Sequence, residues 1–297
     1  MQKYKIGIAG LGGIGGLLGV LFENKGYKIF SSKLDNKKLV TFNLKSNYYG
    51  NLDAKIIVNS NLKDANIIFI CSKYQYLKKH LKKINNKNAL IIPILNGRSH
   101  FEILKKKFNN KIFIANIGKV VSKINKKNQI LHSSNNAPEV LISSEKKNKK
   151  DLRTIKNVLS KIRLKVKIKS KNSDVIWSKL IRLSPISALT ALYNCNLGQI
   201  RSSKLKMDQL NTLIKETLII SKKNDNYRDS YTNVKNLIKS LPDKLNTSLQ
   251  RDINSGVSSE LETQIGSIVK LSKKLNISSP MNEKIYLLLK KKCQKRF

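Results

Sequence analysis

The feature that most constrains the fold is a glycine-rich stretch near the start of the chain. The apolar run Lys5-Ile6-Gly7-Ile8-Ala9 predicts a short buried strand, and the apolar residues 17–22 predict a helix soon after it. Between them lies Gly10-Leu11-Gly12-Gly13-Ile14-Gly15, which has the pattern G-x-G-x-x-G. Between a strand and a helix, this pattern is typical of a turn that binds a dinucleotide.

Each glycine of such a turn has a physical role. The first permits a tight turn, the second lets the backbone approach a pyrophosphate, and the third lets the helix pack closely against the strand. The free N–H groups and the positive end of the helix dipole then attract the phosphates. We therefore expect residues 10–15 to bind the pyrophosphate of a dinucleotide cofactor.

The end of the second predicted strand, 27–30, bears on which dinucleotide binds. An NAD site places a carboxylate there for the ribose hydroxyls, whereas this chain has Ser31, Ser32 and Lys33. Two hydroxyls and a cation suit the 2′-phosphate of NADP(H). NADP(H) is thus the expected cofactor, and Asp35, the nearest acid, keeps NAD as the alternative.

Strand and helix patterns alternate over the first half of the chain. Continuous apolar runs predict central parallel strands at 65–71, 89–95 and 112–115. Helices are expected at 74–84, 101–108 and 152–162. Two shorter segments, 129–131 and 140–142, look like antiparallel edge strands, and a last strand is expected at 165–168. This predicts a Rossmann-type doubly wound sheet over residues 1–168, with ligands at the carboxyl ends of the strands.

The second half of the chain has no strand pattern. A polar linker is expected at 169–174, and an all-helical domain is expected over 169–297. Its predicted helices are 175–193, 205–223, 232–241, 257–275 and 281–292.

The first of these helices carries Lys179, in a stretch with few other lysines. Lys179, Leu183 and Ser187 are four residues apart and share one helix face. Burial disfavours an ammonium group, so a buried lysine either has an anionic partner or becomes an acid with a pKa near neutrality. Pro185 is expected to bend the helix just beyond the lysine.

Composition excludes several classes of protein. The 297 residues suffice for two domains, and the net charge of +41 raises the possibility of a nucleic-acid partner. However, the lysines are spread over all predicted surfaces without interleaved aromatic residues or a DNA-binding motif, as an AT-rich coding sequence would produce. Three unpaired cysteines and three scattered histidines indicate a cytoplasmic protein without disulfides or a metal site. No specific nucleic-acid or membrane partner is expected.

Several motifs occur in a specific order along the chain. They are the glycine-rich turn, Cys71-Ser72-Lys73-Tyr74-Gln75, Leu95-Asn96-Gly97, Trp177-Ser178-Lys179-Leu180, Leu189-Thr190-Ala191-Leu192, Ser248-Leu249-Gln250-Arg251-Asp252-Ile253, Gly256 and Glu260-Leu261-Glu262. Together they resemble the ketopantoate reductase (2-dehydropantoate 2-reductase) family over essentially the full length of the chain.

This resemblance implies an NADPH-dependent reduction of ketopantoate to pantoate in pantothenate synthesis, in a cleft between the two domains. It implies that Lys179 protonates or polarises the developing alkoxide and that Glu260 orients the lysine or the substrate. It also implies that Lys73, Asn96 and Glu260 lie at the cofactor, and that Asn96 and Ser248 bind the substrate. A monomer or a homodimer is expected.

The chain departs from the family at two positions on the lysine helix. The family usually has asparagines there, facing the substrate, whereas this chain has Leu183 and Ser187. Because a site built on amide hydrogen bonds rejects molecules that lack the matching groups, these changes can redirect specificity. The alternatives to ketopantoate reduction are reduction of another 2-oxo acid, a non-catalytic NADP-binding protein and a nucleic-acid-binding protein. The presence of both Lys179 and Glu260 favours an enzyme.

Overall fold

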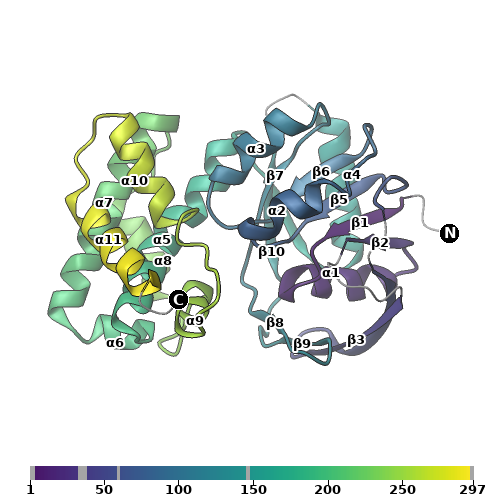
Figure 1. Cartoon of the computed structure of the whole chain (residues 1–297), viewed down its shortest axis with the longest axis horizontal. Coiled ribbons are helices and arrows are strands. Elements are labelled where there is room, and N and C mark those ends of the chain that lie inside the picture. The colour runs from purple at the N-terminus through teal and green to yellow at the C-terminus, as the bar shows by residue number, and fades with distance from the viewer. Residues whose placement is uncertain (1–3, 33–38, 59–60, 145–147, 295–297) are drawn as a thin grey trace. The chain divides into compact units, whose positions relative to one another are not determined.

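The computed structural model describes residues 4–32, 39–58, 61–144 and 148–294. The chain forms two compact units (Figure 1). The first unit comprises Met1–Leu95 and His100–Val175, and the second comprises Asn96–Ser99 and Ile176–Phe297. The division at Val175 comes later in the chain than the expected domain boundary at residue 168. The short segment Asn96–Ser99 belongs to the second unit although both of its neighbours in sequence belong to the first.

A parallel sheet forms the centre of the first unit, as predicted for a doubly wound fold. Its strand order is β2-β1-β5-β6. The strands are β1 (Ile6–Ala9), β2 (Ile29–Ser31), β5 (Ile67–Ile70) and β6 (Leu90–Pro93). β1 and β5 are buried along their whole length, which explains why their sequences are uninterrupted apolar runs. The chain reverses its direction of travel across the sheet between β1 and β5, and ligands of such sheets bind at that point.

A second sheet contains a hairpin that the sequence analysis did not predict. The strands β3 (Leu39–Ser46), β4 (Gly50–Ile57), β8 (Ser122–Ile124) and β9 (Gln129–His132) lie in the order β4-β3-β9-β8. The signal was the alternation of buried Val40, Phe42 and Leu44 with exposed or half-buried residues. Helix α1 (Gly13–Glu23) contacts strands of both this sheet and the parallel sheet, so it is buried from two sides (Figure 1).

A third sheet, with the order β11-β10-β7, completes the strands of the first unit. It consists of β7 (Ile114–Gly118), β10 (Glu139–Ser143) and β11 (Lys165–Ile168). The strand expected at 112–115 is not a central parallel strand, because Ile112 forms a single bridge to Ile91 and β7 is antiparallel to β10. The expectation that 129–131 and 140–142 form antiparallel edge strands was also wrong. Both β9 and β10 are inner strands with one parallel and one antiparallel neighbour. The alternation of apolar and polar residues along a strand indicates which of its faces is buried. It does not indicate which strands pair with it, because those strands come from distant parts of the sequence.

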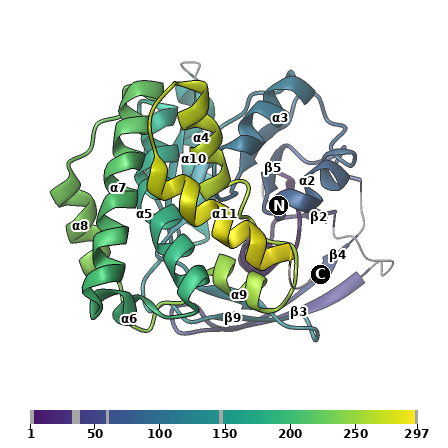
Figure 2. The same cartoon turned by 60° about the vertical axis from the view of Figure 1, so that its left-hand side comes forward.

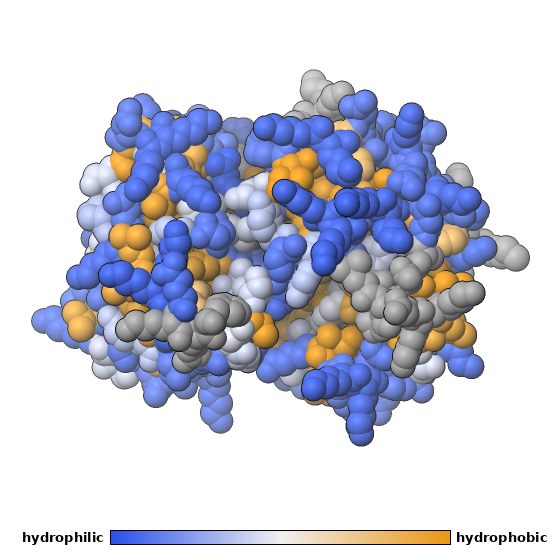
Figure 3. Space-filling view, viewed as in Figure 1, coloured by the Kyte–Doolittle hydropathy of each residue, from blue (hydrophilic) through white to orange (hydrophobic). Residues whose placement is uncertain are grey.

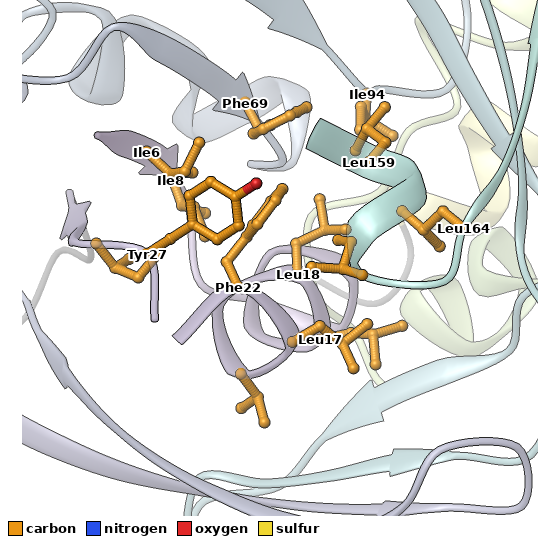
Figure 4. Packing of buried hydrophobic residues seen from close by; sticks show 14 of the residues in the cluster. Ile6, Ile8, Leu17, Leu18, Phe22, Tyr27, Phe69, Ile94, Leu159 and Leu164 are labelled. Atoms are coloured by element: carbon orange, nitrogen blue, oxygen red, sulfur yellow. The ribbon is translucent and has the colours of Figure 1, made fainter. Parts of the chain in front are cut away.

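Helices and aromatic side chains fill the rest of the first unit. The remaining helices are α2 (Tyr74–Leu81), α3 (Ser99–Lys107) and α4 (Lys149–Lys161). Phe22 of α1 packs edge-on against Tyr27, with ring centroids 5.3 Å apart, and stacks on Phe69 of β5 at 5.5 Å (Figure 4). These contacts hold α1, and with it the glycine-rich turn, against the parallel sheet.

The second unit is helical, as predicted, throughout the part that the structure describes. Its helices are α5 (Asn172–Tyr193), α6 (Leu197–Arg201), α7 (Lys204–Asp225), α8 (Tyr231–Lys239), α9 (Ser248–Asn254), α10 (Ile265–Lys274) and α11 (Pro280–Gln294). Helices α7, α10 and α11 pack together (Figures 1 and 2). The short helices α6 and α9 were not predicted.

Two predicted helix boundaries in this half of the chain were wrong. Helix α5 begins at Asn172, inside the expected linker, and the expected helix 257–275 begins only at Ile265. Residues 257–259 are irregular and residues 260–264 form a bend and turns instead. The backbone carbonyl of Glu260 accepts hydrogen bonds from the N–H groups of both Thr263 and Gln264. Glu260 therefore lies in a tight turn before α10 and not in the helix.

Helix α5 is the longest apolar segment among the described residues. By length and composition alone it could cross a membrane, and no other described helix meets both criteria. However, 67% of its apolar window is buried inside the protein. Its side chains Trp177, Leu180 and Leu189 belong to the hydrophobic core of the second unit. Burial in a protein core therefore accounts for its apolar sequence.

Charged side chains fix the ends of two helices in the second unit. The carboxylate of Glu216 on α7 accepts hydrogen bonds from the backbone N–H groups of Met281 and Asn282, both at 2.9 Å, and from the Asn282 side chain at 2.7 Å. The ammonium of Lys292 on α11 donates to the carbonyls of Ala191 and Leu192 at the end of α5. Both charges complement the helix dipole at the end where they lie.

We expect Glu216→Ala to lower the free energy of unfolding of the second unit by about 2–3 kcal/mol, because buried donors lose a charged acceptor. Glu283→Ala is the matched control, since that side chain is 39% exposed and lies 3.7 Å from Lys273. It should change stability by less than about 1 kcal/mol. Urea unfolding followed by circular dichroism measures both, and equal effects would contradict the assigned role of Glu216.

Candidate functional site

The turn between β1 and α1 requires glycine at two positions. Gly10 has φ +97°, and a Cβ there would lie 2.7 Å from Cα of Ser72. A Cβ on Gly15 would lie 1.9 Å from the carbonyl oxygen of Gly10. No larger residue fits at either position without movement of the backbone. The first glycine therefore brings the turn against the end of β5, and the last one packs α1 against the turn.

Gly12, in contrast, faces open space. A Cβ at this position would have no heavy atom within 4 Å. Gly12 is the N-cap residue of α1, and no side chain caps the first turn of this helix. Its free N–H groups suit the pyrophosphate of a dinucleotide, and the space beside Gly12 lets the backbone approach it. The residues of this turn therefore fit a dinucleotide cofactor.

Gly13 has a different neighbour, which the sequence pattern did not reveal. A Cβ there would lie 2.4 Å from the carbonyl oxygen of Ser122 on β8. The hydroxyl of Ser122 donates to the carbonyl of Gly13 at 2.8 Å. The second sheet thus approaches the glycine-rich turn. Leu11 is buried beneath the turn and Ile14 is half-buried against the core of the first unit.

The serines expected at the 2′-phosphate are buried, with internal partners. Ser31 is 0% exposed and its hydroxyl donates to the carbonyl of Ile57 at 3.0 Å. Ser32 is 1% exposed and its hydroxyl lies 2.8 Å from Nδ1 of His80. Burial lowers the pKa of His80, which favours its neutral form. Both hydroxyls therefore have hydrogen-bond partners inside the first unit, and their contact with a cofactor stays a prediction. Lys33 lies outside the described residues.

The carboxyl end of β5 contributes one exposed and one buried polar residue. Lys73 is exposed at the N-cap position of α2. Ser72 is 7% exposed, and its hydroxyl has no hydrogen-bond partner among the described residues. Because Ser72 contacts Gly10, this unsatisfied hydroxyl lies beside the glycine-rich turn. A buried hydroxyl of this kind at a strand end suits hydrogen bonding to a polar ligand.

The second unit brings together three of the residues predicted for the site. Glu260 is 8% exposed, and its carboxylate accepts a hydrogen bond from Nδ2 of Asn96 at 2.8 Å. Nε2 of Gln264 donates to the same oxygen at 3.4 Å. Burial raises the pKa of Glu260, whereas the bond from Asn96 and the charge of Lys179 oppose that rise. Asn96, Lys179 and Glu260 thus form one polar cluster.

Lys179 is the titratable member of this cluster. Burial lowers the pKa of its ammonium to about 8, the nearby charge of Arg182 adds to the decrease, and Glu260 opposes it. A lysine with this pKa gives up or takes a proton near neutral pH. That property is required of a general acid.

The other predicted substrate residues are placed differently. Leu183 is half-buried one helical turn after Lys179. Ser187 is 0% exposed, and its hydroxyl has no hydrogen-bond partner among the described residues. Ser248 is half-buried at the first position of α9, where Thr247 is the N-cap and accepts from Gln250 N–H. The lysine helix thus presents a hydrocarbon where the family has an amide.

Sequence reasoning missed a group of side chains next to this cluster. The indole Nε1 of Trp177 donates to Oδ2 of Asp225 at 2.6 Å, and Arg98 lies 3.8 Å from the same oxygen. Gln264 was missed as well. Arg98 lies two residues after Asn96, and Trp177 lies two residues before Lys179. This closeness in sequence to two predicted site residues was the signal that could have indicated them. Within the described ranges, no group of three His, Cys, Asp or Glu residues could hold a metal ion.

Comparison with known families identifies the chain. A family model described as "Ketopantoate reductase PanE/ApbA" matches residues 6–141. Another, described as "Ketopantoate reductase PanE/ApbA C terminal", matches residues 173–293. The chain belongs to the ketopantoate reductase PanE/ApbA family. It is an NAD(P)-dependent oxidoreductase that acts on CH–OH groups, and the resemblance inferred from the motifs is confirmed.

Individual known proteins resemble the chain at low identity. The uncharacterized oxidoreductase YkpB of Bacillus subtilis (strain 168) is 22% identical over 225 residues, which are 74% of each chain. A D-mandelate dehydrogenase solved with NADH and anilino(oxo)acetate has a TM-score of 0.88 at 18% identity, covering 98% of this chain and 99% of that one. A PanE/ApbA family ketopantoate reductase from Ralstonia eutropha JMP134 has a TM-score of 0.87 at 16% identity, with the same coverage. These structures support the fold.

We expect Gly12→Ala to fold normally but to bind the nicotinamide cofactor about ten- to a hundredfold more weakly, as when one charge-assisted hydrogen bond is lost. Gly15→Ala should instead lower the thermal stability, because its Cβ meets the carbonyl of Gly10. Calorimetric titration with the cofactor and thermal unfolding distinguish the two effects. Unchanged cofactor affinity in Gly12→Ala would contradict a pyrophosphate site at this turn.

Proposed function

We propose that this protein reduces ketopantoate to pantoate with NADPH, in pantothenate synthesis. The observation that carries this proposal is the cluster of Lys179, Glu260 and Asn96 in a chain of the ketopantoate reductase family. When bound, the cofactor supplies a hydride to the keto carbon of a 2-oxo acid. The negative charge that develops on the keto oxygen then needs a proton.

Lys179 supplies that proton in the proposed mechanism. Its ammonium hydrogen-bonds the keto oxygen and transfers a proton to it as the alkoxide forms. The carboxylate of Glu260 supports the charged form of Lys179, and the amide of Asn96 keeps that carboxylate in place. Ser248, at the start of α9, hydrogen-bonds the substrate. The excess of cations favours an anionic substrate such as a 2-oxo acid.

NADP(H) remains the proposed cofactor, but the serine hydroxyls are no longer part of the reason. The hydroxyls of Ser31 and Ser32 have internal partners, so they do not support the choice of NADP(H). The choice of NADP(H) is supported by the residue types at the end of β2. Ser31 and Ser32 stand where an NAD site has a carboxylate, and the cationic Lys33 follows them. The kinetic preference between NADPH and NADH measures this directly.

The excess positive charge does not favour a nucleic-acid partner. Hydrophilic side chains are spread over the visible face of each unit and apolar ones form separate small areas (Figure 3).

One relative of this fold is a dimeric ketopantoate reductase from Staphylococcus aureus, with a TM-score of 0.82 at 18% identity. We propose a homodimer on this basis, and sedimentation at moderate salt measures it.

The first test is oxidation of NADPH by the purified protein in the presence of ketopantoate. Lys179→Ala should lower kcat by about 10²–10⁴-fold, the usual contribution of a general acid. Reduction needs the protonated lysine, so in the wild type kcat/KM should fall as the pH rises through about 8. The reverse reaction needs the neutral amine and should gain rate over the same pH range. A reduction rate that is flat across pH 7–9 would remove Lys179 from the proposed role.

Reduction of a less polar 2-oxo acid is the second candidate function, and Leu183 is the observation that favours it. Leu183→Asn restores the amide of the family. If apolar acids are the natural substrates, this variant should raise kcat/KM for ketopantoate by about tenfold or more, the equivalent of one hydrogen bond. Leu183→Ala is the control, because it adds space without an amide. Ketopantoate activity that is high in the wild type and unchanged in Leu183→Asn would exclude this candidate.

A further inference from the structure

A group of three side chains connects the segment Asn96–Ser99 to the helix that carries Lys179. Trp177 is 0% exposed, and its indole N–H donates to Asp225 at 2.6 Å. Arg98 lies 3.8 Å from the same carboxylate oxygen, and its guanidinium lies 5.8 Å from the centre of the Trp177 ring. Asp225 is the last residue of α7. One carboxylate therefore binds a residue of α5 and a residue of the segment 96–99.

The same segment is also fixed by a close backbone approach at Gly97. Gly97 has φ +83°, and a Cβ there would lie 2.0 Å from the carbonyl oxygen of Thr263. Thr263 belongs to the same tight turn as Glu260, whose carbonyl accepts the Thr263 N–H. The segment is thus held by Asp225 at Arg98 and by the turn of Glu260 at Gly97. Because Asn96 and Arg98 flank Gly97, neither can move far while both contacts hold.

We propose that Asp225 is a positioning residue that, through Arg98 and Trp177, holds the amide of Asn96 on the carboxylate of Glu260 beside Lys179. This proposal rests on the proposed function for its catalytic meaning, but the contacts themselves do not depend on the substrate. None of the three side chains has a reacting group that the reduction needs. Their effect on the reaction passes through Asn96.

The direction of that effect follows from the charges around Lys179. The hydrogen bond from Asn96 favours the ionised form of Glu260, and the Glu260 charge favours the ammonium of Lys179. The positive charge of Arg182 disfavours that ammonium, and the negative charge of Asp252 disfavours ionised Glu260. A displaced Asn96 therefore leaves Glu260 less ionised and lowers the pKa of Lys179 further.

The test compares Asp225→Asn with a matched ion pair elsewhere in the second unit. Arg201 and Asp243 form that pair, so Asp243→Asn is the control. In Asp225→Asn, the fall of kcat/KM for reduction should move to lower pH by about half a unit or more. Asp225→Glu, which keeps the carboxylate, should recover part of this shift. The affinity for NADPH should stay the same in Asp243→Asn.

Two further measurements do not require turnover. Trp177 is the single tryptophan of the chain, so its fluorescence reports directly on the bond to Asp225. Pulse labelling with acetic anhydride across a pH series, read by mass spectrometry of the Lys179 peptide, gives the protonation midpoint of Lys179. We expect altered fluorescence and a lower midpoint in Asp225→Asn, and neither change in Asp243→Asn. Arg98→Gln should lower the midpoint as well, and serves if Asp225→Asn does not fold.

The outcomes separate this proposal from the proposed function. Altered Trp177 fluorescence with an unchanged Lys179 midpoint would overturn the positioning role, and so would fluorescence that does not respond to Asp225→Asn. A lower midpoint in a protein that reduces no 2-oxo acid would uphold the connection between Asp225 and Lys179 while refuting the proposed function. A loss of thermal stability alone, with the midpoint and the pH profile unchanged, would indicate a purely structural residue.

Discussion

The buried carboxylate of Glu260 is the interaction on which the arrangement of the second unit depends. Glu260 is only 8% exposed, and a buried carboxylate is stable only if hydrogen-bond donors and a cation surround it. Asn96 and Gln264 are those donors, and Lys179 is the nearby cation. This requirement explains why the chain turns tightly at Glu260 before α10 begins, and why Asn96 belongs to the helical unit rather than to the sheet that precedes it.

Features that depend on neighbours in sequence were predicted well. The glycine-rich turn, the buried parallel strands at 65–71 and 89–95 and most helices follow from local spacing of apolar residues, and the structure confirms them. The pairing of β9 and β10 and the bond from Trp177 to Asp225, 48 residues apart, depend on contacts that local patterns do not encode. The late start of α10 has the same origin, since burial of the Glu260 carboxylate overrides the helical pattern of 257–264.

The serines at the end of β2 show a different limit of sequence reasoning. Their position in the chain correctly places Ser31 as the last residue of a parallel strand and Ser32 directly after it. Position does not determine where a hydroxyl points, and both hydroxyls bond to groups inside the first unit. The residue type at a strand end therefore predicts a binding role only if the side chain has no hydrogen-bond partner inside the protein. In this chain those partners are the carbonyl of Ile57 for Ser31 and the ring of His80 for Ser32.

The double burial of α1 also shows how this chain tolerates its extreme composition. The protein has 59 lysines and arginines, yet α1 has neither, although it begins only twelve residues from the start. Both sides of this helix pack on sheets, and glycines 16 and 19 leave room only for the side chains of Ile130 and Ile56. Residues 15–22 of α1 are all buried, which leaves no place there for a charged side chain. In a chain this rich in lysine, a stretch without lysine therefore marks a surface that faces the core.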